Sequence, residues 1–262
     1  MQLEFQGAIV NFATGGVQID PSQPPVLMVH GAGMDRTVWS QQTRHLAHHG
    51  FSAMAVDLPG HGDSTGELLT TVPEMADWLA ALIRSLNFGP VRLVGHSMGC
   101  LIGLEVAARH GDVTERLVLM GAAAAMPEHP DLLGAAERNE TLAPQLMTAW
   151  AHGSRAHIAG NPTPGLWMRS GCQALLERAS DGVIFNDLSA CNFYEAGDIA
   201  GQVDCPVTVI VGSEDKMTPP KATAQLVAGF QEVDLRHLEG TGHMMMLEAP
   251  DQIREIVLAA LQ

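Results

Sequence analysis

Short apolar runs alternate with longer amphipathic segments along most of the chain. Within the amphipathic segments, apolar residues recur at helical spacing, most clearly from Val72 to Leu86, where they fall on one side. The runs of strand length are Val26–Val29, Ser52–Val56, Val91–Val94, Arg116–Met120, Pro206–Val211 and Val233–Leu238, and the other helical segments are Val38–His49, Cys100–His110, Pro219–Gly229 and Asp251–Leu261. This alternation predicts an α/β fold with a doubly wound, mostly parallel sheet and right-handed crossovers.

The alternation lapses between residues 126 and 200, where no strand pattern is visible. Three helical patches remain, and the stretch Gly160–Gly165 breaks them; the patches are Leu132–His152, Cys172–Ala179 and Val183–Phe193. We therefore expect a core made of residues 1–125 and 201–262. Residues 126–200 would form a helical cap over the carboxyl edge of the sheet, where α/β proteins place their sites.

The segment Val91–Cys100 carries the first candidate for chemistry. It runs from an apolar strand into a helix through Gly95-His96-Ser97-Met98-Gly99. The flanking glycines allow a sharp turn, which leaves the Ser97 hydroxyl at its tip, beside a helix N-terminus. Ser97 is therefore a candidate nucleophile, and the alternative is a serine that only caps the helix.

A serine nucleophile needs a base and an acid that orients the base. His243 lies in a glycine-rich loop after the last strand, and Asp215 follows the strand that ends at Val211. Glu214 is the nearest competitor for the acid. The loop after Arg116–Met120 has no carboxylate before Glu128, so that alternative position for the acid is empty.

Four motifs together resemble the α/β-hydrolase fold superfamily, in particular its cap-bearing esterase, enol-lactonase and carbon–carbon hydrolase branch. The chain order Ser97, Asp215, His243 is the order of that superfamily. The resemblance covers nearly the whole core and implies an eight-stranded sheet. The motifs are His30-Gly31-x-Gly33, Asp57-Leu58-Pro59-Gly60-His61-Gly62-Asp63-Ser64, Gly95-x-Ser97-x-Gly99, and Gly212-Ser213-Glu214-Asp215 with Gly242-His243.

The resemblance also implies an oxyanion hole made of two backbone N–H groups. Met98 follows the nucleophile, and Ala32 follows His30-Gly31, with Gly33 as the fallback donor. His30, His61 and His96 are interpreted as structural residues. Apolar residues near the predicted site indicate an adaptable apolar pocket; they are Met34, Trp150, Trp167, Met168, Tyr194, Met217 and Met244, with Gly33 beside them.

The composition of the chain argues against some classes of binding partner. The net charge of −15 argues against nucleic acid and acidic membranes as partners, and no metal-ligand spacing or signal-peptide pattern is present in the sequence. The four cysteines, which are widely scattered among the 262 residues, are interpreted as reduced thiols. We expect a cytoplasmic monomer or homodimer that acts without a cofactor on a small molecule.

Three functions remain open at this stage. The first is a serine esterase or lactonase that works through an acyl-enzyme. The second is a carbon–carbon hydrolase of a ring-fission diketone, for which Arg155, Arg169 and Asn192 are the only leads to polar groups. The third, of another class, is a ligand receptor on the same fold with vestigial turnover.

Overall fold

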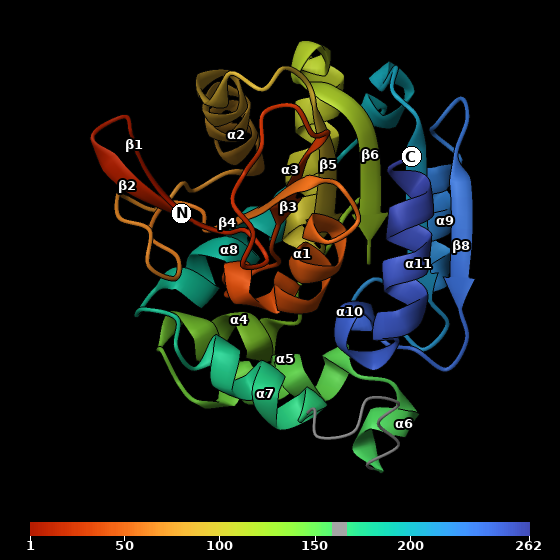
Figure 1. The fold of residues 1–262 in the computed structure, drawn as a ribbon. Coiled ribbons are helices and arrows are strands. Elements are labelled where there is room, and N and C mark those ends of the chain that lie inside the picture. Colours follow the sequence, from red (N-terminus) through yellow and green to blue (C-terminus); the bar gives the residue numbers. More distant parts are fainter. Residues whose placement is uncertain (159–166) are drawn as a thin grey trace.

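One sheet of eight strands runs through the computed structural model, which describes residues 1–158 and 167–262. The strand order is β1-β2-β4-β3-β5-β6-β7-β8, antiparallel at β1 and β2 and parallel from β4 to β8 (Figure 1). The strands are β1 Gln2–Phe5, β2 Ala8–Ala13, β3 Pro25–Val29, β4 Ser52–Val56, β5 Val91–His96, β6 Thr114–Met120, β7 Val207–Gly212 and β8 Asp234–Leu238. The mostly parallel sheet expected from the sequence is confirmed.

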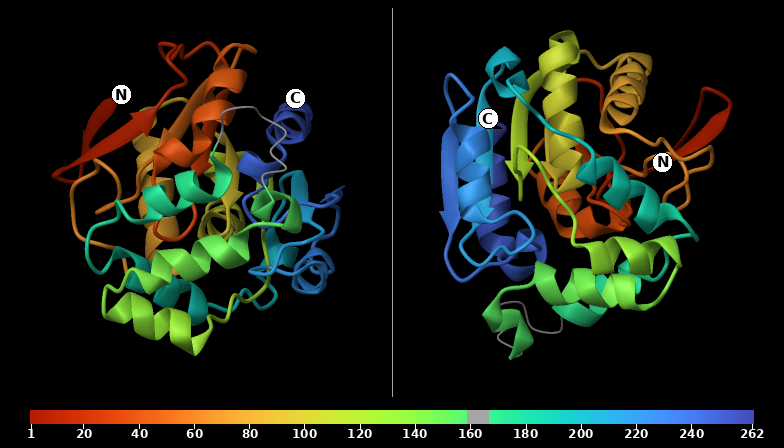
Figure 2. Two further views of the ribbon diagram at one scale, coloured as in Figure 1. Left: turned by 90° about the horizontal axis from the view of Figure 1, so that it is seen from below. Right: turned by 180° about the vertical axis from the view of Figure 1, so that it is seen from behind.

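Helices cover both faces of this sheet. Figures 1 and 2 show α1 (Ser40–Ala47) and α11 (Pro250–Ala260) on one face, with α2 (Val72–Leu86), α3 (Met98–Arg109) and α9 (Pro220–Val227) on the other. Short helices complete the connections: η1 Arg36–Trp39, η2 Gly111–Val113, η3 Ile199–Gln202 and α10 Met245–Glu248. Strands β3, β4 and β7 are buried at every position, which explains their continuous apolar runs.

Helix α2 has the bounds that its periodicity predicts. Thr71 and Glu74 form a capping box at its start, so two otherwise unpaired N–H groups are satisfied there. Asn87 ends the helix in the left-handed conformation at φ 57°.

Residues between β6 and β7 form the inserted helices, a name used below for α4 to α8. They are α4 Pro130–Glu137, α5 Leu142–Ala151, α6 Ser154–His157, α7 Met168–Leu176 and α8 Val183–Asn192. The arrowheads of β6 and β8 point toward the side where α4, α5 and α7 lie (Figure 1). The predicted patch Leu132–His152 is two helices, because the chain turns at Asn139 with φ 52°. The predicted break at Gly160–Gly165 lies outside the described residues.

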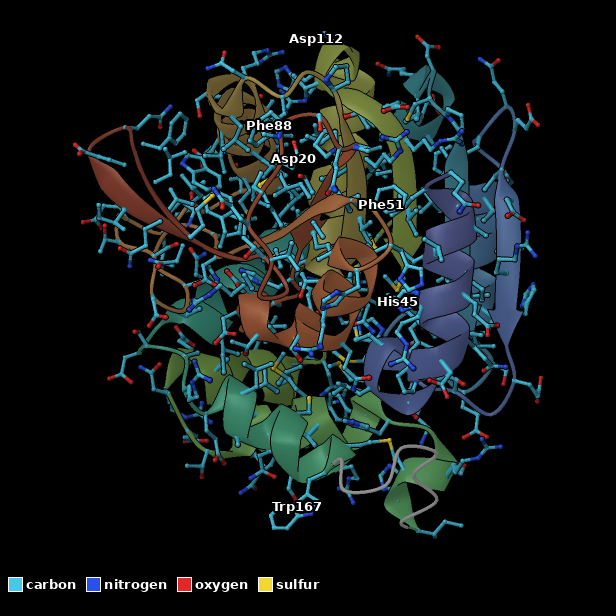
Figure 3. All side chains as sticks on the ribbon, in the orientation of Figure 1. Asp20, His45, Phe51, Phe88, Asp112 and Trp167 are labelled. Atoms are coloured by element: carbon cyan, nitrogen blue, oxygen red, sulfur yellow. The ribbon has the colours of Figure 1, made fainter. Side chains whose placement is uncertain are left out.

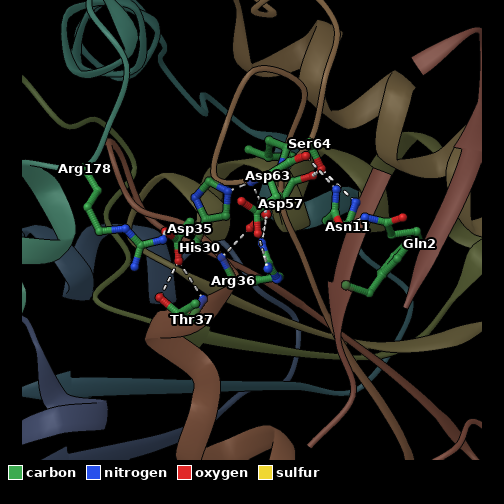
Figure 4. A network of polar contacts seen from close by, with 12 residues as sticks. Gln2, Asn11, His30, Asp35, Arg36, Thr37, Asp57, Asp63, Ser64 and Arg178 are labelled. Carbon is green, nitrogen blue, oxygen red and sulfur yellow. Dashed lines mark hydrogen bonds and ion pairs between the residues drawn. The ribbon is translucent and has the colours of Figure 1, made fainter. Parts of the chain in front are cut away.

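Two loops at the carboxyl edge are tied together by a polar network around Arg36 (Figure 4). The Arg36 guanidinium pairs with Asp57 and Asp63, and its backbone N–H donates to Asp57 Oδ1 at 2.6 Å. Asp35 in turn pairs with Arg178, which follows α7, at 3.0 Å. These contacts hold the loop after β3 against the loop after β4 and against the inserted helices.

Across residues 1–158 and 167–262, no helix has the length and apolar character that a membrane crossing requires.

Candidate active site

Ser97 occupies a strained turn between β5 and α3. Its φ of 54° and ψ of −118° are rare for a residue with a side chain. A Cβ at Gly95 would lie 2.3 Å from the Gly99 carbonyl oxygen, and one at Gly99 would lie 2.4 Å from that of Val29. Only glycine fits at either position, so the sequence pattern has a direct steric cause.

His243 and Asp215 form a buried pair at the carboxyl edge of the sheet. His243 Nδ1 lies 2.8 Å from Asp215 Oδ2, and both side chains are almost completely buried. Asp215 Oδ1 also accepts the N–H groups of Met217 and Thr218, at 2.9 and 2.8 Å, and the Thr218 hydroxyl donates to Oδ2 at 2.7 Å. These bonds fix the carboxylate so that it accepts the Nδ1 proton of His243.

The other ring nitrogen of His243, Nε2, is the one that can accept a proton. Among the described residues, His243 Nε2 has no hydrogen-bond partner, and no hydrogen bond joins it to Ser97. Both residues line one cavity. Burial lowers the pKa of His243, but the neighbouring Asp215 carboxylate more than offsets this, so the pKa lies above its usual value.

Glu214 faces away from this pair. Its carboxylate accepts the backbone N–H of Ser154 at 2.5 Å, at the start of α6, and in the described part of the chain no hydrogen bond or ion pair joins it to His243. Of the two adjacent acids, the structure brings only Asp215 to His243.

Two of the three backbone N–H groups considered for an oxyanion hole donate no hydrogen bond within the described part of the chain. Gly33 N–H donates to Asp187 Oδ2 at 2.8 Å, so the fallback donor is already occupied. Among the described residues, neither Ala32 nor Met98 donates its N–H to another group. A Cβ at Gly31 would lie 3.1 Å from Ser97 Cβ, so this loop packs directly against the serine turn.

His61 connects the same loops to the inserted helices. Its Nδ1 lies 3.0 Å from the Pro59 carbonyl oxygen and its Nε2 lies 2.8 Å from Asp187 Oδ2. Both partners are acceptors, so both ring nitrogens must donate and His61 is a buried imidazolium. Burial lowers its pKa, but Asp187 outweighs that effect and the pKa is raised. The adjacent His30 is neutral, because burial and His61 lower its pKa to about 4.

The cavity around Ser97 is small and largely apolar. Its enclosed space is about 20 Å³, enough for about one water molecule, so a bound substrate must displace some of the lining side chains. The lining residues are Ala32, Met34, Ser97, Glu128, Met147, Ala151, Cys172, Leu176, Leu188, Cys191, Met217 and His243. Leu176 also lines an outer groove of about 400 Å³ between α4, α5 and α7, so the two spaces are neighbours.

Of the residues predicted to form the pocket, Met34 and Met217 line this cavity, and the predicted aromatic residues are not part of its described lining. Trp167 is 77% exposed and projects outward from α7 (Figure 3). Trp150 packs edge-on against His129, with ring centroids 5.6 Å apart.

The remaining predicted pocket residues also lie elsewhere. Tyr194 donates its hydroxyl to Glu105 at 2.8 Å. Met168 and Met244 are buried outside the described cavity lining, and Gly33 is held by Asp187 against Ile184. None of these residues belongs to the described lining of the cavity that contains Ser97.

The sequence analysis missed the cavity residues that the inserted helices contribute. Leu188 and Cys191 of α8 lie on the helix face that also carries Asp187, a spacing of three to four residues that was visible in the sequence. Glu128 was noticed only as a carboxylate too far along for the acid of the triad. Groups of three or more potential metal ligands are not found in the described part of the chain.

Known proteins share the sequence pattern and the fold of this chain. Residues 26–256 match the sequence model of the alpha/beta hydrolase family. The chain is 30% identical to an esterase of Mycobacterium tuberculosis, Rv0045c, over 97% of this chain and 87% of that protein. It is 24% identical to the (E)-2-((N-methylformamido)methylene)succinate hydrolase of Acinetobacter baylyi, over 91% and 90%. Among solved structures, the enol-lactonase of Burkholderia xenovorans aligns with a TM-score of 0.87 at 20% identity, covering 100% and 99%.

Proposed function

Because the chain belongs to the alpha/beta hydrolase family, we propose that it is a serine hydrolase that cleaves a small carboxylic ester or lactone through an acyl-enzyme. One observation carries this proposal. Asp215 holds His243 through Nδ1 at 2.8 Å. His243 Nε2 has no hydrogen-bond partner among the described residues, and His243 lines one cavity with Ser97. The 30% identity to an esterase adds support for an ester substrate.

The reaction assigns one role to each residue. His243 Nε2 takes the hydroxyl proton while Ser97 Oγ attacks the substrate carbonyl carbon. The N–H groups of Ala32 and Met98 hold the resulting oxyanion, and each such donor contributes on the order of 10²–10³ in rate. His243 then gives its proton to the leaving oxygen, and afterwards activates a water molecule that releases the acid. No metal or cofactor is needed for these steps.

We further propose that residues 126–200 act as a cap domain on a core of residues 1–125 and 201–262. The support is that Glu128, Met147 and Leu188, which come from this segment, line the cavity that contains Ser97. A cap in this place excludes water and shapes the pocket, while the core supplies the chemistry.

The test is a fluorophosphonate probe combined with a substrate panel. We expect the probe to label Ser97, and Ser97→Ala to abolish both labelling and all but a small residual turnover. The panel contains short esters, lactones and a ring-fission diketone. Turnover of the diketone alone would favour the carbon–carbon hydrolase, and binding without turnover would favour a receptor. Labelling at another residue would reject the proposal.

A further inference from the structure

Glu128 lies in the same cavity as Ser97 and His243. It follows β6 and precedes α4, and its backbone N–H donates to Asn192 Oδ1 at 2.9 Å, which fixes it against the end of α8. In the described part of the chain, no hydrogen bond or ion pair reaches its carboxyl group. The backbone of Glu128 is therefore held in place, while its carboxyl group has no hydrogen-bond or ion-pair partner among the described residues.

The cavity that contains Glu128 is lined mostly by apolar side chains, and His243 is the one basic side chain in its described lining. Neither lysine nor arginine occurs among the described lining residues. Two other titratable side chains line the same cavity, His243 and Cys191 of α8. The charge of His243 lowers the pKa of Glu128, and the charge of Glu128 raises the pKa of the Cys191 thiol. Burial raises the pKa of Glu128 to about 7, with a smaller lowering by His243. An ionised, unpaired carboxylate is costly here, so a ligand that pairs with it is stabilised.

We propose that Glu128 selects esters that carry a cationic nitrogen on the part of the substrate lodged in this cavity. The inference rests on the proposed ester hydrolysis and adds the substrate class to it. A cationic group would neutralise the carboxylate inside the cavity, whereas a substrate carboxylate would meet a like charge there. The net charge of −15 acts in the same direction, because it attracts cations toward the molecule.

Three aryl esters with one skeleton test the inference. Their acyl chains end in tert-butyl, trimethylammonium or carboxylate, so the first two share a shape and differ only in charge. The value of kcat/KM, divided by the rate of hydroxide-catalysed hydrolysis of the same ester, is measured for the unmodified protein, Glu128→Gln and Glu137→Gln. Glu137 is an exposed acid of α4, so its variant makes the same change in net charge away from the cavity.

We expect the unmodified protein and Glu137→Gln to prefer the trimethylammonium ester over the tert-butyl ester by about tenfold or more. In Glu128→Gln this ratio should fall to near one, and the carboxylate ester should gain relative to the other two. An equal ratio in all three proteins, or a preference for the carboxylate ester, would overturn the inference.

A second readout needs no variant. The trimethylammonium to tert-butyl ratio should rise between pH 6 and pH 8 as Glu128 ionises, while the effect of His243 is common to both esters and cancels. A ratio that does not change with pH would count against Glu128. If the tert-butyl ester is not hydrolysed and Ser97 is not labelled, the proposed function itself fails. If the ester is hydrolysed without a preference for the cation, only the inference about Glu128 fails.

Discussion

His61 Nε2 lies 2.8 Å from Asp187 Oδ2 and joins the loop after β4 to helix α8. The same carboxylate oxygen accepts the Gly33 N–H at 2.8 Å, one residue after the proposed oxyanion donor Ala32. A single side chain of the inserted helices therefore holds two loops of the core. A shift of α8 would therefore move the loop residues that lie next to Ser97.

The first prediction concerns this ion pair. His61 has a raised folded-state pKa, since Asp187 outweighs burial, so its stabilisation is complete below about pH 6.5 and is lost as pH rises through the folded value. Asp187 has a lowered pKa, because His61 and its other donors outweigh burial, so its contribution is lost only in strong acid. Asp187→Asn should therefore lower the free energy of unfolding by about 3–5 kcal/mol at pH 6 and by less at pH 9.

Urea denaturation at the two pH values measures this difference. Asp77→Asn is the control, because Asp77 also pairs with a histidine, His110, but its side chain is 55% exposed. Its effect should be small. A loss of stability in Asp187→Asn that is the same at pH 6 and pH 9 would contradict a charged His61.

The second prediction separates the two adjacent acids. Asp215→Asn should reduce kcat by about 10⁴, because an amide cannot hold His243 in the required tautomer, whereas Glu214→Gln should change kcat little. The pH profile adds a second test. For the unmodified protein, kcat/KM should rise through a midpoint above pH 6.5, since Asp215 raises the pKa of His243. Comparable losses in the two variants would show that the acid is assigned wrongly.

The third prediction uses a glycine that lies against the ring of His243. Gly121 follows β6 directly and has φ 67°, and a Cβ there would lie 2.8 Å from His243 Cε1 and 2.9 Å from Nδ1. Gly121→Ala should therefore displace the ring and lower kcat by about 10². Gly89→Ala is the matched control, because Gly89 also has a positive φ, 78°, but a Cβ there meets nothing within 4 Å. Steady-state kinetics give kcat for the two variants. An equal kcat in both would show that the His243 ring tolerates the added methyl group.

The sequence predicts which polar residues meet at the edge of the sheet better than which side chains line the cavity, for a physical reason. Ser97, Asp215 and His243 stand at strand ends beside glycines, and a parallel sheet brings its strand ends to one edge whatever the details of packing. The cavity wall depends instead on the rotation of each inserted helix. Trp167, which precedes α7, points outward, while Leu188 points inward. Both residues are apolar, so the residue type alone does not show which of them lines the cavity. The position of Glu128 along the chain likewise does not show that it lines the cavity.

The last prediction tests which residues of the inserted helices set substrate size. Leu188 is 1% exposed and lines the cavity of about 20 Å³, so shortening it enlarges a space that otherwise holds about one water molecule. Leu188→Ala should shift the preference among p-nitrophenyl esters from acetate toward longer acyl chains, at a cost of about 2–5 kcal/mol in stability. Trp167→Ala removes a larger side chain, but one that is 77% exposed, so the preference should stay the same and stability should change by no more than about 0.5 kcal/mol. The decisive measurement is the ratio of kcat/KM for hexanoate over acetate. If Trp167→Ala moves that ratio and Leu188→Ala does not, the cavity around Ser97 is not where the acyl chain binds.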